Sequence, residues 1–130
     1  MIPVNIPNFS NSEIECKCGC GYRFIKDKLL IHLQALRDML SFSSGYPVRL
    51  MITSGCRCKK HNKSVGGVEN SRHVTGEAVD VYSPDVDLEQ LFSYAIVSNL
   101  FSTMILYEKS KFVHLDIREA SEKKFWTWNK

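Results

Sequence analysis

Two short segments of this chain place strong limits on how it can fold. In the first, His73 and Asp80 lie on either side of Gly76, and the second, at 113–116, contains His114. Two imidazoles, one carboxylate and a water make a four-coordinate zinc site with an open position, which is typical of a catalytic zinc. Gly76 permits a backbone geometry that turns a loop histidine back towards a strand carboxylate. The pattern predicts a hydrolytic metalloenzyme.

The second of these segments belongs to a stretch that alternates as a β-strand does. A period of two puts three apolar side chains on the core face and leaves His114 and Asp116 on the other face. A histidine and an aspartate in that position do not fill a core, so they meet either water or a ligand. The core-facing residues are Val113, Leu115 and Ile117, and the other face also carries Phe112 and Arg118.

The remaining pattern predicts a single α+β domain over residues 1–130. Leucines at helical spacing predict a helix that is capped by Asp27 and ends near Ser43, and Asp87 begins another helix. A loop as long as 54–76 is usually functional. This order of elements indicates a mainly antiparallel sheet flanked by helices. Strands are expected at 48–53, 77–82, 103–107 and 112–118, a helical turn at 59–63, a surface-wrapping segment at 1–25 and a C-terminal tail at 119–130.

Composition excludes several classes of protein. A chain of 130 residues with 44% hydrophobic residues is sufficient for one core. No apolar run is long enough to cross a membrane, and residues 1–7 lack the features of a signal peptide. We therefore expect synthesis in the cytoplasm without a leader, no membrane insertion and a monomer. The net charge of +3 suits an anionic polymer but is too small to indicate nucleic-acid binding.

Five cysteines occur in two tight groups and allow more than one interpretation. Their odd number argues against a complete disulfide framework. Their spacing, with one residue between neighbours, is tighter than is usual in zinc knuckles. A second, structural metal and one or two disulfides both stay open, and free thiols are the leading expectation. The two groups are Cys16, Cys18 and Cys20, and Cys56 and Cys58.

Four motifs together resemble a known family, the zinc D-Ala-D-Ala carboxypeptidases and related phage cell-wall peptidases. The wider group also includes murein endopeptidases and the hedgehog domain, and the resemblance runs from about residue 9 to residue 118. The motifs are Thr53-Ser54-Gly55-Cys56-Arg57, His61-Asn62 with Val65-Gly66-Gly67, Ser71-x-His73-x-x-Gly76-x-Ala78-x-Asp80, and Val113-His114-x-Asp116.

The resemblance implies a hedgehog-like fold, one catalytic zinc and a function for several side chains. His73, Asp80 and His114 would be the zinc ligands. Arg57 would act in catalysis and substrate binding, because a guanidinium suits a carboxylate or a developing oxyanion. Ser71 would contact the substrate or the ligands, or would have a purely local turn role. The substrate would be the stem peptide of peptidoglycan, cut by a carboxypeptidase or an endopeptidase, and the chain would be a phage or prophage product acting after release.

One position departs from the family pattern. Several relatives have a general base three residues before the last ligand, where this chain has Lys111. Asp116 is the substitute, either as base or as the acceptor that fixes the tautomer of His114. Glu77 and Glu108 are weaker candidates for the base. The alternatives are a non-catalytic zinc-containing binding module and, more remotely, an interaction protein in which the cysteines hold the only metal.

The C-terminal aromatic cluster, Phe125-Trp126-Thr127-Trp128, has two interpretations. An aromatic face can stack on the apolar face of a sugar, but such clusters more often dock onto the core. Docking is therefore expected, after a turn or short helix at 121–124.

Overall fold

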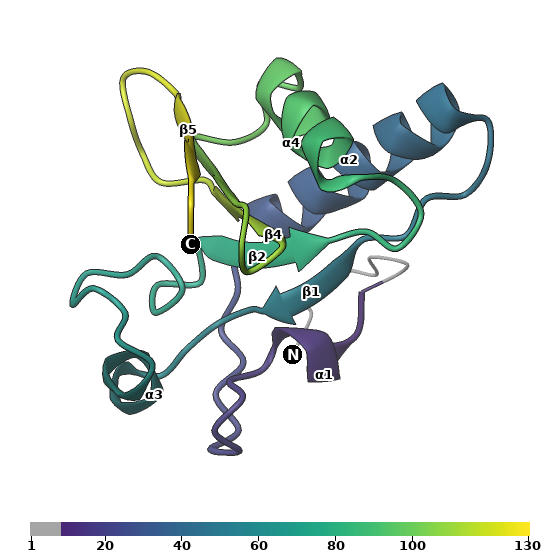
Figure 1. The fold of residues 1–130 in the computed structure, drawn as a ribbon. Helices are drawn as coiled ribbons and strands as arrows, with labels where there is room; N and C mark the ends of the chain where they lie inside the picture. Colours follow the sequence, from purple (N-terminus) through teal and green to yellow (C-terminus); the bar gives the residue numbers. More distant parts are fainter. Residues whose placement is uncertain (1–8) are drawn as a thin grey trace.

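Five strands form one sheet in the computed structural model, which describes residues 9–130 (Figure 1). The strand order is β1-β2-β4-β3-β5, and every pair is antiparallel except β3 and β5. The predicted α+β class with a mainly antiparallel sheet is therefore confirmed. The strands are β1 (Met51–Ser54), β2 (Ala78–Tyr82), β3 (Thr103–Tyr107), β4 (Phe112–Asp116) and β5 (Lys124–Trp128).

Two helices, α2 (Asp27–Ser44) and α4 (Leu88–Val97), cover one face of the sheet (Figure 1). The predicted N-cap of α4 is confirmed, since the Asp87 carboxylate accepts the N–H of Gln90. The apolar faces of both helices pack on the core side of the strands. The core includes Leu29, Leu33, Leu36 and Leu40 of α2, Leu91 and Ala95 of α4, and Val79, Val81, Met104, Val113 and Leu115 of the sheet. None of the helices within residues 9–130 is long and apolar enough to span a membrane.

The N-terminal segment does more than wrap the surface. Ser10 and Glu13 form a capping box that begins a short helix, α1 (Asn11–Ile14). This helix lies against β1, away from α2 and α4 (Figure 1). Ile14 is the last residue of α1, and its apolar side chain is buried in the core beside β1. Residues 1–8 of the predicted segment lie outside the described residues.

The C-terminal tail is a strand. Residues 124–128 form β5, which pairs in parallel with β3 and places Trp126 beside Ile105. Aromatic residues and threonine favour extended backbone, and this strand satisfies the hydrogen-bonding groups along the outer edge of β3. The predicted docking occurs at the edge of the sheet, but the aromatic side chains do not join the core, since Trp126 and Trp128 stay 38% and 41% exposed.

The sheet face opposite α2 and α4 carries the polar side chains. In β2 and β4 the apolar residues alternate with Asp80, His114 and Asp116, as the strand period predicts. The register places Asp80 directly beside His114. A short helix, α3 (Lys59–Ser64), lies in the long loop where a helical turn is expected. This loop connects β1 to β2 and brings His73 next to the polar side chains of β2 and β4.

Candidate active site

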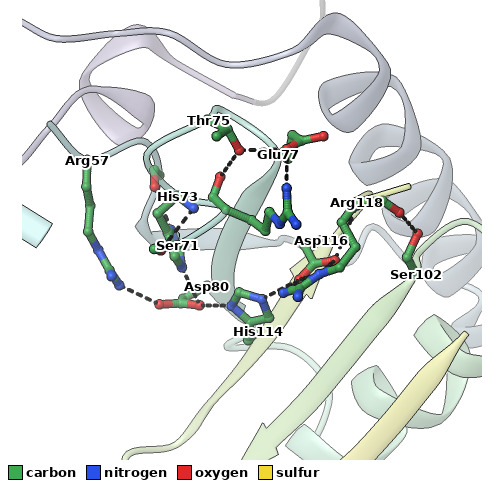
Figure 2. Close-up of polar contacts among 12 residues, drawn as sticks. Arg57, Ser71, His73, Thr75, Glu77, Asp80, Ser102, His114, Asp116 and Arg118 are labelled. Atoms are coloured by element: carbon green, nitrogen blue, oxygen red, sulfur yellow. Dashed lines mark hydrogen bonds and ion pairs between the residues drawn. The ribbon is translucent and has the colours of Figure 1, made fainter. Parts of the chain in front are cut away.

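The predicted ligand set converges on one point of the polar face (Figure 2). The Nε2 atom of His73 lies 3.3 Å from Oδ1 of Asp80, and the Nδ1 atom of His114 lies 3.1 Å from the same oxygen. One nitrogen of each ring and one carboxylate oxygen all lie within 4.8 Å of one another. The arrangement of these three groups fits a single metal ion with nitrogen and oxygen ligands.

His73 is held by the backbone around it. Its Nδ1 atom lies 2.7 Å from the carbonyl oxygen of Gly55, so this nitrogen donates to the backbone and Nε2 is the ring nitrogen that faces Asp80. Its own N–H donates to the Ser71 hydroxyl over 3.2 Å. The turn that follows needs Gly76, whose φ is 74° and whose Cβ would lie 2.8 Å from the carbonyl oxygen of Phe24. The loop therefore fixes the ring before any ligand arrives.

His114 is held by a second carboxylate. Its Nε2 atom lies 2.9 Å from Oδ2 of Asp116, which is completely buried. Arg118 binds both oxygens of the same carboxylate, with Nη2 2.6 Å from Oδ2 and Nε 3.0 Å from Oδ1. Asp116 is thus occupied by two partners and fixes the orientation of His114. The side chain is on the polar face of the sheet but has no exposed surface.

The electrostatics of the three groups favour a cation. Burial opposes ionisation of Asp80, but hydrogen bonds with His114 and His73 hold its pKa well below the usual range. Burial lowers the pKa of His114, yet the hydrogen bonds with Asp116 and Asp80 raise it to about 9. The pKa of Asp116 is lowered by His114 and Arg118 despite its own burial. Two buried carboxylates therefore hold positive charge on the ring between them, and a divalent ion would take the place of that proton.

Arg57 lies beside Asp80 of the ligand set (Figure 2). Three side chains contact its guanidinium. Its Nη2 atom is 3.6 Å from Oδ2 of Asp80, its Nη1 donates to Oδ1 of Asn62 over 3.1 Å, and its Nε donates to the Ser54 hydroxyl over 3.3 Å. The site leaves no room at Gly67, where a Cβ would lie 2.1 Å from Oδ1 of Asn62 and 3.1 Å from Nη1 of Arg57. The guanidinium is therefore fixed at the edge of the ligand set.

A groove of about 490 Å³ opens over these residues. Its lining includes one set of cationic residues and one set of aromatic residues. Tyr107 stacks on Phe112 with ring centroids 4.4 Å apart, and Trp128 meets Tyr107 edge-on at 5.6 Å. The cationic residues are Arg57, Arg72, Arg118 and Lys130, and the aromatic residues are Tyr107, Phe112, Trp126 and Trp128.

The other predicted site residues lie away from the groove floor. The Glu77 carboxylate is bound by Lys26 at 3.1 Å and Arg72 at 3.4 Å, and hydrogen bonds from Thr75 and Lys26 lower its pKa despite burial. Glu108 is exposed in the turn between β3 and β4, and neither glutamate lines the groove. Lys111 is exposed in the same turn, with a φ of 62°.

Sequence reasoning missed several residues of the site. Asn62 is buried and binds both Arg57 and the carbonyl oxygen of Val68. A signal was present, since Asn62 belongs to a motif that resembles the peptidase family, but the motif gave no partner for it. Tyr107 had no signal, and the two tryptophans were noted only as a cluster that could stack on a sugar, because only the strand pairing shows that these side chains share one face with His114.

Comparison with known proteins gives one family. The family model described as peptidase M15 matches residues 7–116, and these include Arg57 and all three candidate ligands. No curated protein gives a significant match. The matched region ends with the last residue of β4 and covers most of the chain. The chain belongs to the peptidase M15 family.

Proposed function

We propose that this protein is a zinc-dependent peptidase that hydrolyses an amide bond in the peptide part of peptidoglycan. The observation that carries the proposal is the convergence of His73, Asp80 and His114 at the floor of one groove. M15 peptidases depend on zinc, and this donor set is of the type that zinc prefers.

The residues present fit the metal. Each imidazole has its second nitrogen held by an acceptor, Gly55 for His73 and Asp116 for His114, so both rings present the correct nitrogen to one ion. Three protein ligands leave a position open to substrate or water. When bound, zinc supplies a Lewis acid that polarises a carbonyl oxygen and activates water at neutral pH.

Arg57 supplies the fixed positive charge at the reacting carbonyl. Its guanidinium is held by Asn62 and Ser54 and lies beside Asp80, at the edge of the groove. A preorganised donor in this position stabilises the negative charge that develops on oxygen, and its planar fork also suits a substrate carboxylate. Ser71 contributes mainly by accepting the N–H of His73.

The groove suits an anionic peptide. Four of its lining side chains are cationic, and Asp80 is the single carboxylate among the described residues that line it. The stem peptide of peptidoglycan carries free carboxylates, which these cations would attract. The aromatic wall offers flat surfaces for the sugar or for apolar side chains of the same polymer.

A second candidate function rests on that same shortage of carboxylates. Asp116 is buried under Arg118, Glu77 is bound by two cations, and neither reaches the groove. A protein without a proton acceptor at the reacting centre would bind a cell-wall peptide through the zinc without cutting it. This alternative is a zinc-containing binding module of the same fold.

Digestion of purified peptidoglycan separates these functions. The zinc-loaded protein is incubated with the polymer beside a His73→Ala control, and the released fragments are identified by mass spectrometry. Free D-alanine identifies a carboxypeptidase, and opened cross-links or freed stem peptides identify an endopeptidase. If the protein holds zinc and sediments with peptidoglycan but releases no fragment, the binding module is the correct function.

A further inference from the structure

Four of the five cysteines converge at a second point, away from the ligand set of the active site. Cys16, Cys18 and Cys20 lie in the loop after α1, and Cys58 immediately precedes α3. Their four Sγ atoms all lie within 4.8 Å of one another. Since Cys58 is 42 residues from Cys16 along the chain, the fold itself brings these thiols together.

The distances among three of the sulfurs match one tetrahedral ion, and the Sγ atom of Cys20 lies within 4.8 Å of each of them. The Sγ atom of Cys16 lies 3.5 Å from that of Cys18 and 3.8 Å from that of Cys58, and the last two are 3.7 Å apart. Four thiolates about 2.3 Å from one zinc ion, at the corners of a tetrahedron, are about 3.8 Å from one another. A disulfide needs a separation of about 2.05 Å, and all five cysteines are free.

The loop that carries three of these cysteines is folded tightly around them. Gly19 and Gly21 have φ values of 84° and 86°, which residues other than glycine rarely adopt. The N–H of Cys16 donates to the carbonyl oxygen of Tyr22 over 2.7 Å and closes the loop at its base. Close spacing in the sequence is therefore compatible with one ion, because the chain reverses between the cysteines.

Backbone amides point at two of the sulfurs. The N–H of Cys58 donates to Sγ of Cys16 over 3.4 Å, and the N–H of His61 donates to Sγ of Cys58 over 3.3 Å. Hydrogen bonds of this kind stabilise thiolate over thiol. Lys59 and Lys60 follow Cys58 in the chain and add positive charge near a cluster that would carry net negative charge with one zinc.

The fifth cysteine, Cys56, lies in the same region but contacts backbone carbonyl groups instead of the other four thiols. Cys56 is buried, and its Sγ atom lies 3.2 Å from the carbonyl oxygens of Ile14 and Tyr22. It does not belong to the group of four. Cys56 is therefore a matched control for the others.

We propose that Cys16, Cys18, Cys20 and Cys58 bind a second zinc ion with a structural role. Four thiolates close the coordination shell and leave no open position, which is typical of structural zinc. A tetrahedral sulfur site accepts zinc or iron, and sulfur separations of 3.5–3.8 Å fit one ion at the centre. The chain then binds two zinc ions, rather than the single catalytic zinc that the sequence predicts.

The second ion would fix the segment that shapes the active site. Cys58 directly follows Arg57, and the Cys56 N–H donates to the carbonyl oxygen of Ile14 over 2.9 Å. Gly55, the next residue back, holds the ring of His73. A zinc ion at the cysteines therefore fastens the N-terminal loop to residues 55–58 and keeps both Arg57 and His73 in position.

Metal analysis of the full chain tests the second zinc. The protein is prepared with zinc under reducing conditions, and metal per chain is measured by plasma mass spectrometry for four forms. We expect two zinc ions in the wild type and in Cys56→Ser, and one in His73→Ala and in the double variant Cys18→Ser/Cys20→Ser. Cobalt substitution adds a spectroscopic readout, since sulfur ligands give an intense charge-transfer band in the near ultraviolet that histidine and aspartate do not give.

The outcomes are distinct even if the double variant fails to fold. The cobalt-loaded wild type and His73→Ala must both show the sulfur charge-transfer band. One metal per wild-type chain without that band, bound iron, or disulfides found by mass spectrometry of the unreduced protein would each overturn the second zinc site. None of these readouts uses peptidase activity, so loss of the proposed function would leave them unchanged.

Discussion

The Nε2 atom of His114 lies 2.9 Å from Oδ2 of Asp116, and the two residues occupy the same face of one strand. The carboxylate has no exposed surface, and it fixes both the tautomer and the direction of the ring. Asp116 is therefore a positioning residue for the proposed metal site, and its substitution tests that role.

Asp116→Asn should weaken zinc binding without removing a ligand. Asparagine has the same shape but no charge, and Arg118 loses its ion pair. Loss of such a partner costs about 10- to 100-fold in metal affinity. Competition with a chromogenic chelator measures the affinity, and Glu108→Gln, in the exposed turn, is the control. An unchanged affinity would show that Asp116 does not orient the ligand.

Arg57→Ala should remove peptidase activity while zinc remains bound. Loss of one preorganised donor to a developing oxyanion lowers kcat by about 10²- to 10³-fold. Cleavage of peptidoglycan fragments and zinc content are measured together, with Lys63→Ala in the exposed part of α3 as control. A drop in both cleavage and zinc content would show that Arg57 helps to hold the metal rather than to stabilise the reacting group.

Gly67→Ala should displace Arg57 without changing its chemistry. The new methyl group would lie 2.1 Å from Oδ1 of Asn62, which cannot move freely because its Nδ2 donates to Val68 over 2.7 Å. We expect a smaller loss of kcat than for Arg57→Ala, with unchanged zinc content. Full activity in this variant would mean that the contact between Asn62 and Arg57 has no effect on catalysis.

The ion pair of Arg49 and Asp85 should give the folded chain an acid-sensitive contribution to stability. Hydrogen bonds from Arg49 lower the pKa of Asp85 to about 2. A carboxyl with a depressed pKa stabilises the fold above its ordinary pKa of about 3.9, and this contribution is lost as pH falls through about 2. The small advantage in Tm over Arg49→Gln should therefore be constant near neutral pH, decrease below about pH 4 and vanish below about pH 2. A difference in Tm that persists in acid would contradict this assignment.

Trp128→Ala should weaken the binding of polymeric substrate more than it slows the reaction. The side chain lines the groove next to Tyr107 and carries no part of the ligand set. Loss of one aromatic contact of about 1 kcal/mol corresponds to a rise in KM of about five- to tenfold. Steady-state kinetics on soluble peptidoglycan fragments separates KM from kcat, and a change in kcat alone would exclude a binding role.

The grouping of His73, Asp80 and His114 was expected from the motifs of the family that the chain resembles, and two parts of it also have local signals. The strand period in 112–118 places His114 and Asp116 together, and the glycine turn orients His73 towards Asp80. The helices were predictable for the same reason, from leucine spacing and from the N-cap at Asp87. Each of these features depends on residues that are near in the sequence.

The features that were not predictable depend on pairing over long distances. The cysteine group joins residues separated by 42 positions, and their spacing argued against a metal until the reversal at Gly19 and Gly21 was visible. The strand β5 was expected as a tail, because a short exposed run has no apolar alternation to identify it. The contact between Asp116 and Arg118 is local instead, but the strand pattern that places both residues on one face does not show that they bind each other.

The position of β5 separates two parts of the molecule that can change independently. The family match ends at Asp116, so the ligands and Arg57 lie within the matched region, whereas Trp126 and Trp128 lie beyond it. This edge strand lines the groove with Trp126 and Trp128 and contributes none of the three candidate ligands. Exchange of residues 124–128 should therefore change which molecules the groove binds, while the three candidate ligands and Arg57 stay the same.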